Sequence, residues 1–311
     1  MKGADYDLLI PMHKFYHFAC KVQHVKAIRA SGGIGIFVNR SLCSGIHVFS
    51  SHELVAWIKL DCKFFNFDQD VYIACAYLPP EGSTYSAAGG NYFDILESEI
   101  TKYSSSGNIL LCGDLNARTG TYNDFITAIP STDTGISRFA NIPTFGAGNY
   151  NIAPRYSLDK TRPNKYGKEL LKLCKTGNML ICNGRLGMDK GVGKLTCYTA
   201  HSKSVVDYLV SSYSSLQLIQ NFQVESLRAE SDHCLITFNL NTNCKRSTYE
   251  PQQGRSKIYY KWDPTRIPKH FEELTSDIAC SKLAEFISLL TGDTTLLRRL
   301  VMVFIHTLYR Q

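Results

Sequence analysis

The chain has 311 residues, of which 44% are hydrophobic and 20% charged, and a formal net charge of +7. This composition leaves room for a sizeable core and excludes a wholly disordered protein. A modest positive excess suits a polyanionic partner, but by itself it selects none.

The cysteines predict a reducing environment. There are eleven of them, an odd number, and none forms a Cys-x-x-Cys pair. A free cysteine inside an apolar run behaves as a small buried hydrophobe, as expected for Cys75, Cys112, Cys182 and Cys234. We therefore expect neither a disulfide framework nor a zinc site.

The sequence shows no targeting or membrane signal. The N-terminus lacks the apolar core of a secretory signal peptide. No apolar run approaches the roughly 20 residues of a membrane-spanning helix. The expected protein is intracellular, nuclear or cytoplasmic, is not secreted and does not contact a membrane.

The first half of the chain reads as strands and one helix. Residues 1–30 show no periodicity and are expected to be irregular. Apolar residues at helical spacing predict an amphipathic helix over residues 92–103. Apolar runs predict strands at residues 34–38, 54–60, 71–77 and 109–112.

The second half begins with residues 121–160, which are rich in Gly, Thr, Ser, Asn and Pro and are expected to form a long surface loop. A helix is expected from Lys165 to about Gly177. Strands are expected at residues 179–182, 195–199, 205–210 and 235–240. Because many strands are consecutive, the pattern favours two packed sheets with helices outside them over a doubly wound parallel sheet.

The composition changes after residue 240. Residues 241–257 are polar, contain Pro251 and are expected to be a linker. Residues 258–311 are expected to be a helical tail, whose apolar faces pack on the domain or on each other. The predicted globular domain therefore covers residues 1–240.

One motif at a strand end carries chemistry. The run Gly113-Asp114-Leu115-Asn116 follows the strand at residues 109–112. Residues two apart on an extended backbone point to the same side, so a carboxylate and a carboxamide are aimed together beyond the sheet. The carboxylate can hold Mg²⁺ or orient a water, and the amide can donate to an oxygen that gains charge. An Asx turn without any function explains this motif alone equally well.

Two further motifs make the pattern specific. Asp207 and the pair Asp232-His233 each lie beside an apolar, strand-like run. The three motifs in this order resemble the endonuclease/exonuclease/phosphatase superfamily, and most closely the endonuclease domain of LINE-type (non-LTR) retrotransposons. The likeness extends over roughly residues 1–240. Segments 31–38 and 76–80 resemble the family's glycine-rich strand and its strand-end tyrosine followed by prolines. Segments 164–167, 183–185 and 195–197 resemble the retrotransposon branch specifically.

This resemblance implies a fold and a reaction. The implied fold is α+β, a four-layer, deoxyribonuclease-like sandwich of two mainly antiparallel β-sheets flanked by helices. The implied reaction is hydrolysis of a DNA phosphodiester bond with Mg²⁺, or alternatively Mn²⁺. The expected partner is the phosphate backbone of DNA, and no small organic cofactor is expected. The sequence gives no oligomeric state.

The resemblance also implies catalytic roles. His233 would stabilise the charge that develops on the scissile phosphate, and Asp207 would fix the tautomer of that imidazole. Asp114 would orient or deprotonate the attacking water. Asn116 would steady this water or a phosphate oxygen, and Tyr77 would donate its hydroxyl to a phosphate oxygen.

Metal and substrate contacts follow from the same resemblance. Asp232 and Asp114 would hold the metal ion. Thr196 and Arg118 would bind the substrate, Thr196 through the DNA backbone near the cut.

The chain also departs from the family. In the family an Asn and a Glu, the principal Mg²⁺ ligand, precede the glycine-rich strand, whereas the first Asn here is Asn39 and the first Glu is Glu53, both after Gly33. The expectation is a chain truncated at its N-terminus relative to the family, with its first strands missing and its Mg²⁺ site weakened. The segment from Lys261 and the residues after it resemble the connector before a reverse transcriptase.

Two alternatives stay open beside the endonuclease. One is an inactive retroelement remnant that binds nucleic acid. The other is a phosphatase or phosphodiesterase of the same fold, because a fold alone does not fix a reaction.

Overall fold

The computed structural model describes residues 12–19, 33–83, 92–126, 154–200, 202–229, 231–242 and 299–300. By its internal contacts the chain divides into two units, residues 1–247 with 300–311, and residues 248–299. The architecture below is that of the first unit.

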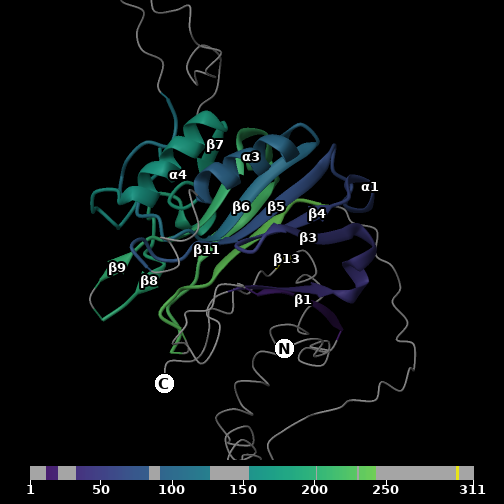
Figure 1. Ribbon diagram of the computed structural model, residues 1–311, viewed down its shortest axis with the longest axis horizontal. Helices are drawn as coiled ribbons and strands as arrows, with labels where there is room; N and C mark the ends of the chain where they lie inside the picture. Colours follow the sequence, from purple (N-terminus) through teal and green to yellow (C-terminus); the bar gives the residue numbers. More distant parts are fainter. Residues whose placement is uncertain are drawn as a thin grey trace, which may run out of the picture. The chain divides into compact units, whose positions relative to one another are not determined.

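A six-stranded sheet with the order β3-β4-β5-β6-β10-β7 forms the centre of this unit (Figure 1). Neighbouring strands are antiparallel except for β5 and β6, which are parallel. Its members are β3 (Ile46–His52), β4 (Val55–Leu60), β5 (Asp70–Tyr77), β6 (Gly107–Asp114), β7 (Met179–Ile181) and β10 (Asp207–Ser212). The central strands are buried almost throughout, because both faces of the sheet are covered.

Two helices, α3 (Tyr92–Ser104) and α4 (Lys165–Thr176), cover one face of the sheet (Figure 1). α3 buries Tyr92, Phe93, Leu96 and Ile100, the helical spacing seen in the sequence. Asn164 caps α4, since its Oδ1 accepts a hydrogen bond from the Gly167 N–H at 2.7 Å. Both predicted helices of the domain are confirmed.

Two antiparallel strand pairs cover the opposite face. They are β1 (His13–Ala19) with β2 (Gly33–Asn39), and β11 (Ile219–Val224) with β12 (Ile236–Leu240). Their apolar side chains share one buried cluster with sheet residues such as Ile73 and Leu110. The predicted α+β sandwich is confirmed, and three of its four expected layers are seen in the described residues.

Short elements complete the unit. They are α1 (Cys62–Phe65), the hairpin of β8 (Cys197–Tyr198) and β9 (Lys203–Ser204), and the 3-10 helices η2 (Arg40–Gly45), η3 (Gly187–Asp189) and η4 (Tyr213–Leu218). Strand β13 (Arg299–Leu300) contains the point in the sequence at which the second unit ends. No described helix is long and apolar enough to cross a membrane.

Some sequence expectations were wrong. Residues 13–19 form strand β1 and are not irregular, and strands β3 and β11 were not predicted. In β11 a register shift between Gln220 and Gln223 breaks the alternation that marks a half-buried strand. The strand expected at 195–199 shortens to β8.

Other expectations lie largely outside the described residues. These are residues 127–153 of the long loop, residues 243–257 of the linker and most of the helical tail. Within that tail, Arg299–Leu300 is a strand where a helix was expected. The four cysteines predicted to lie in apolar runs, Cys75, Cys112, Cys182 and Cys234, are buried.

Candidate active site

Three neighbouring strands place a row of polar side chains at one end of the six-stranded sheet. Tyr77 is the last residue of β5, Asp114 the last of β6 and Asp207 the first of β10. Asp114 is the register partner of both Tyr77 and Asp207. Register partners leave the same face of a sheet on strands about 4.8 Å apart, so the sheet itself brings these side chains together.

Asp114 is positioned by the backbone on both sides of it. Gly113 has a φ of 135°, and a Cβ there would lie 1.9 Å from the carbonyl oxygen of Ala76. Only glycine therefore allows β6 to approach β5 so closely at this point. On the other side, Oδ1 of Asp114 accepts a hydrogen bond from the Asn116 N–H at 2.9 Å, which closes an Asx turn.

The amide of Asn116 supports Asp114 rather than facing away from it. Its Nδ2 donates to Oδ2 of Asp114 at 3.2 Å and to the carbonyl oxygen of Leu78 at 2.7 Å. Asn116 itself has a φ of 47°, a conformation that asparagine tolerates better than most residues. With both amide hydrogens used inside the protein, the oxygen Oδ1 is the atom left to accept from a water.

His233 meets the row at Asp207. Its Nδ1 lies 2.9 Å from Oδ2 and 3.1 Å from Oδ1 of Asp207. The two side chains are 16% and 14% exposed, so one edge of the pair faces solvent. Asp114, Asp207 and His233 each place a ligand-type atom within 4.8 Å of the others.

The electrostatics favour a charged imidazole. Burial lowers the pKa of His233, but hydrogen bonds to Asp207 and Cys197 and the negative charges of Asp207 and Asp114 outweigh it. The pKa of His233 therefore stands well above its ordinary value of 6.5. For Asp207, burial and the charge of Asp114 raise the pKa above 3.8, while the hydrogen bond from His233 opposes the rise. A perturbed acid–imidazole pair at a partly open strand end is typical of a functional site.

The backbone around His233 is held by pairing with the β8 segment. His233 and Cys197 form an antiparallel bridge. On either side of it, the Tyr198 N–H donates to the carbonyl oxygen of Asp232 and the Cys234 N–H to that of Thr196, both at 2.7 Å. The imidazole is thus fixed by strand pairing rather than by a free loop.

Two of the three residues predicted to bind substrate, Thr196 and Arg118, make hydrogen bonds within the protein, and their predicted role stays a prediction. Thr196 is 0% exposed, and its hydroxyl oxygen accepts the N–H groups of Val206 and Asp207, each at 3.0 Å. Arg118 forms two hydrogen bonds, of 2.9 and 3.0 Å, with the carboxylate of Asp159. The Arg118 side chain is still 26% exposed, whereas Thr196 is buried.

Two residues act at the site without a role predicted from the sequence. Asn183 is buried, its Nδ2 donates to the carbonyl oxygen of Asp207, and its Oδ1 accepts from the Leu209 N–H. Cys197 places its Sγ 3.4 Å from Nε2 of His233. Both residues stand in segments that resemble the retrotransposon branch, and this was the only sequence signal for them.

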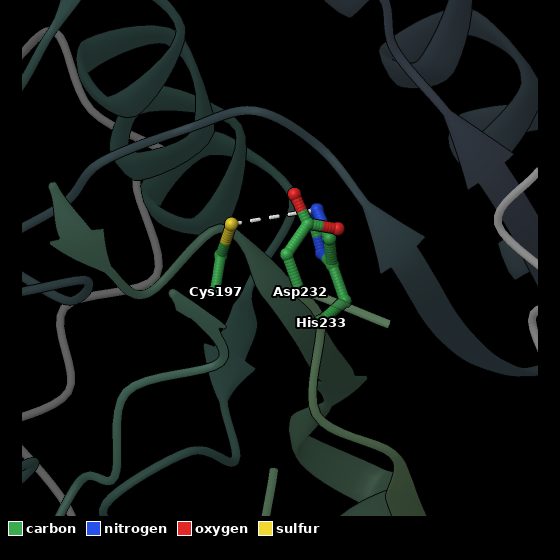
Figure 2. Close-up of side chains that lie close together, drawn as sticks. All are labelled: Cys197, Asp232 and His233. Carbon is green, nitrogen blue, oxygen red and sulfur yellow. Dashed lines mark hydrogen bonds between the residues drawn. The ribbon is translucent and has the colours of Figure 1, made fainter. Parts of the chain in front are cut away.

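Asp232 belongs to a second group of ligand atoms. In Figure 2 its carboxylate overlaps the imidazole of His233, and Sγ of Cys197 lies to the left of both. Asp232, His233 and Cys197 also have ligand atoms within 4.8 Å of one another. Within the described residues, the two carboxylates predicted to hold the metal ion fall in different groups. Asp232 groups with Cys197 and His233, and Asp114 groups with Asp207 and His233.

Both sets of residues could hold a divalent metal ion. Mg²⁺ prefers oxygen ligands and is usually bound through one or two carboxylates, with waters and phosphate oxygens completing the octahedron. The carboxylate of Asp114 offers this chemistry. The donor set around Asp114 therefore fits Mg²⁺ or Mn²⁺.

Comparison with known proteins gives similar structures but no similar sequence family. No family model and no curated protein matches the chain. The endonuclease domain of TRAS1, a telomere-specific non-LTR retrotransposon, is similar at 13% identity and a TM-score of 0.41, over 73% of this chain and 78% of that domain. The AP endonuclease LMAP from Leishmania major is similar at 11% identity and a TM-score of 0.48, over 72% and 69%.

A third similar structure is the 3′ phosphatase NExo from Neisseria bound to a product DNA hairpin, at 12% identity and a TM-score of 0.45, over 77% of this chain and 84% of that one. All three have the endonuclease/exonuclease/phosphatase fold. Similarities this low assign neither a reaction nor a substrate to this chain.

Proposed function

We propose that this chain hydrolyses phosphodiester bonds of DNA with Mg²⁺ or Mn²⁺, as a nicking endonuclease. The observation that carries the proposal is the position of the Asp207–His233 pair. Asp207 on β10 lies directly opposite Asp114 on the neighbouring strand β6. A held imidazolium beside a second carboxylate supplies the charge stabilisation and the proton acceptor that this hydrolysis needs.

His233 is the residue proposed to bear on the scissile phosphate. Its Nδ1–H is engaged by Asp207, which fixes the ring and favours the protonated form. The N–H group at the other nitrogen, Nε2, then donates a hydrogen bond to the phosphorane, on which negative charge develops. Asp207 is a positioning residue, and Thr196 and Asn183 hold its backbone.

Asp114 is the proposed acceptor for the proton of the attacking water. Asn116 orients that carboxylate through its amide and presents Oδ1 to the water. Tyr77, at the end of the next strand, is proposed to donate its hydroxyl to a non-bridging phosphate oxygen.

The metal ion would neutralise charge on the phosphate and lower the pKa of a bound water. Asp114 would hold it, and Asp232, next to His233 in the chain, is the second carboxylate available. The net charge of +7 is in keeping with binding of a phosphate backbone.

The test is nicking of supercoiled plasmid by the full chain with Mg²⁺, compared with His233→Ala. We expect the variant to nick about 1000-fold more slowly while binding DNA with similar affinity. His47→Ala is the matched control, because His47 is an exposed histidine on β3, and it should nick as the parent does.

Equal nicking by His233→Ala and the parent would overturn the assignment of the site. Release of phosphate from a monoester in place of plasmid nicking would overturn the assignment of the substrate.

A further inference from the structure

We propose that Cys197, Asp232 and His233 form a zinc site that overlaps the proposed Mg²⁺ site at Asp232, and that zinc bound there blocks the imidazole of His233. Binding stands on the geometry alone. Only its inhibitory consequence rests on the proposed hydrolysis.

The spacing of the ligand atoms suits a tetrahedral ion. Bonds of about 2.3 Å from zinc to sulfur and about 2.0 Å to nitrogen place those two ligand atoms roughly 3.5 Å apart. The observed distance from Sγ of Cys197 to Nε2 of His233 is 3.4 Å (Figure 2). An oxygen of Asp232 lies within 4.8 Å of Sγ of Cys197 and of a ring nitrogen of His233.

The backbone fixes two of the ligands before any ion arrives. Cys197 and His233 sit opposite each other in an antiparallel bridge, flanked by two backbone hydrogen bonds of 2.7 Å. Little ordering is therefore required of these ligands, which favours binding.

The second nitrogen of the imidazole supplies an independent observation. A histidine that binds a metal generally donates its other ring N–H to a carboxylate, which orients the ring and raises its basicity. Here Nδ1 of His233 is engaged by Asp207 at 2.9 Å, so Nε2 is the nitrogen directed at Cys197.

The donor types select the ion. A thiolate and an imidazole suit zinc, whereas Mg²⁺ and Ca²⁺ prefer oxygen alone. Three protein ligands leave a fourth position for water or a phosphate oxygen. Asp232 is exposed and offers a route of entry, while Cys197 is 6% exposed and lies at the inner end.

Binding exchanges protons and oxidises nothing. The Cys197 thiol loses its proton to become a thiolate, and the His233 imidazolium loses the proton on Nε2. Two protons are released for each zinc ion bound. Nε2 is then committed to the metal and no longer donates to a phosphate, so zinc inhibits hydrolysis.

Cobalt(II) is the first probe, because it takes the same tetrahedral ligands and is coloured. Titration of the metal-free full chain should give a thiolate-to-cobalt charge-transfer band that saturates at one equivalent and disappears when zinc is added. The band should be lost in Cys197→Ser. It should persist in Cys62→Ser, the control for a half-buried thiol elsewhere in the domain.

Competition titrations give the affinities. Cys197→Ser should weaken zinc binding at least about 100-fold, and Asp207→Asn, which changes only the partner of Nδ1, about 10- to 100-fold. Micromolar zinc should slow nicking by the parent and should slow Cys197→Ser at least about 10-fold less, each relative to its own zinc-free rate.

A cobalt band that survives in Cys197→Ser, or the lack of any band in the parent, overturns the site. Since the band is read without substrate, a chain that binds zinc but fails to nick contradicts the proposed function and leaves the zinc site standing. A chain that nicks but shows no band contradicts the zinc site and leaves the proposed function standing.

Discussion

Two of the acid–base pairs in the described part of the chain differ in burial and in how fully their polar atoms are bonded. Asp124 and Arg185 form one, with side chains 1% and 2% exposed, and Asp207 and His233 form the other, at 14% and 16%. Both join segments far apart in the sequence. Only the second faces solvent.

The first pair is saturated with partners. Asp124 receives two hydrogen bonds of 2.8 Å from Arg185 and one of 2.7 Å from the Ile181 N–H, while Arg185 also donates to the carbonyl oxygen of Ile181. Burial raises the pKa of Asp124, but the hydrogen bonds and charge of Arg185 outweigh it, so this pKa is lowered. At Asp207 burial prevails and the pKa is raised.

These differences in exposure, hydrogen bonding and pKa distinguish a structural pair from a reactive one. A buried pair whose charged groups bond to each other and to the backbone is closed to a substrate. In the Asp207–His233 pair, Nε2 of His233 is directed at Sγ of Cys197 and one edge of the pair faces water. Such a pair can still donate a proton to a substrate. Four experiments test this distinction.

The largest expected effect is on stability at the buried pair. Arg185→Met leaves the Asp124 carboxylate buried without its cation and should lower the free energy of unfolding by about 3–5 kcal/mol. Urea unfolding followed by circular dichroism measures this. The double variant Asp124→Leu/Arg185→Met should recover most of the loss, and a single variant within about 1 kcal/mol of the parent would contradict a structural role.

At the reactive pair the effect should fall on rate instead. Asp207→Asn keeps the shape and the backbone bonds to Thr196 but removes the charge that holds the imidazolium, so nicking should slow by about 100-fold. The free energy of unfolding should change by less than about 1 kcal/mol. A stability loss as large as that of Arg185→Met would place both pairs in one class.

The Arg118–Asp159 pair is intermediate, with side chains 26% and 1% exposed. Arg118→Met should cost about 1–3 kcal/mol of stability, because Asp159 keeps its bonds from Thr161 and the Val205 N–H. KM for DNA should stay within about threefold of the parent. A KM raised tenfold or more at unchanged stability would support Arg118 as a substrate-binding residue.

The smallest effect is the dependence on pH. Since the pKa of His233 is raised in the folded chain, its contribution to stability is fully present below 6.5 and is lost as the pH rises toward the folded value. The stability advantage of the parent over Asp207→Asn should therefore shrink as the pH rises above 6.5. Ring chemical shifts of His233 should show it still protonated at a pH of about 7.5 in the parent and titrating at lower pH in the variant. Identical titrations would contradict coupling to Asp207.

Local patterns predicted much of this architecture. The helices at 92–104 and 165–176 and the central strands could be found because their apolar spacing and the Asn164 cap are properties of short segments. Strands β1, β3 and β11 were missed, and in β11 a register shift obscures the periodicity.

The strand-end motifs around Asp114, Asp207 and His233 could be identified from the sequence, because a glycine, an Asx turn and an apolar strand act within a few residues. Which residues those motifs contact depends on the tertiary structure. The contact of Cys197 with His233 spans 36 residues, and the absence of a Cys-x-x-Cys pair gave no hint of it. The burial of Thr196 and the Asp124–Arg185 pair were likewise decided by strand packing. Distant side chains meet only where the sheet brings their strands together, and no local spacing records that.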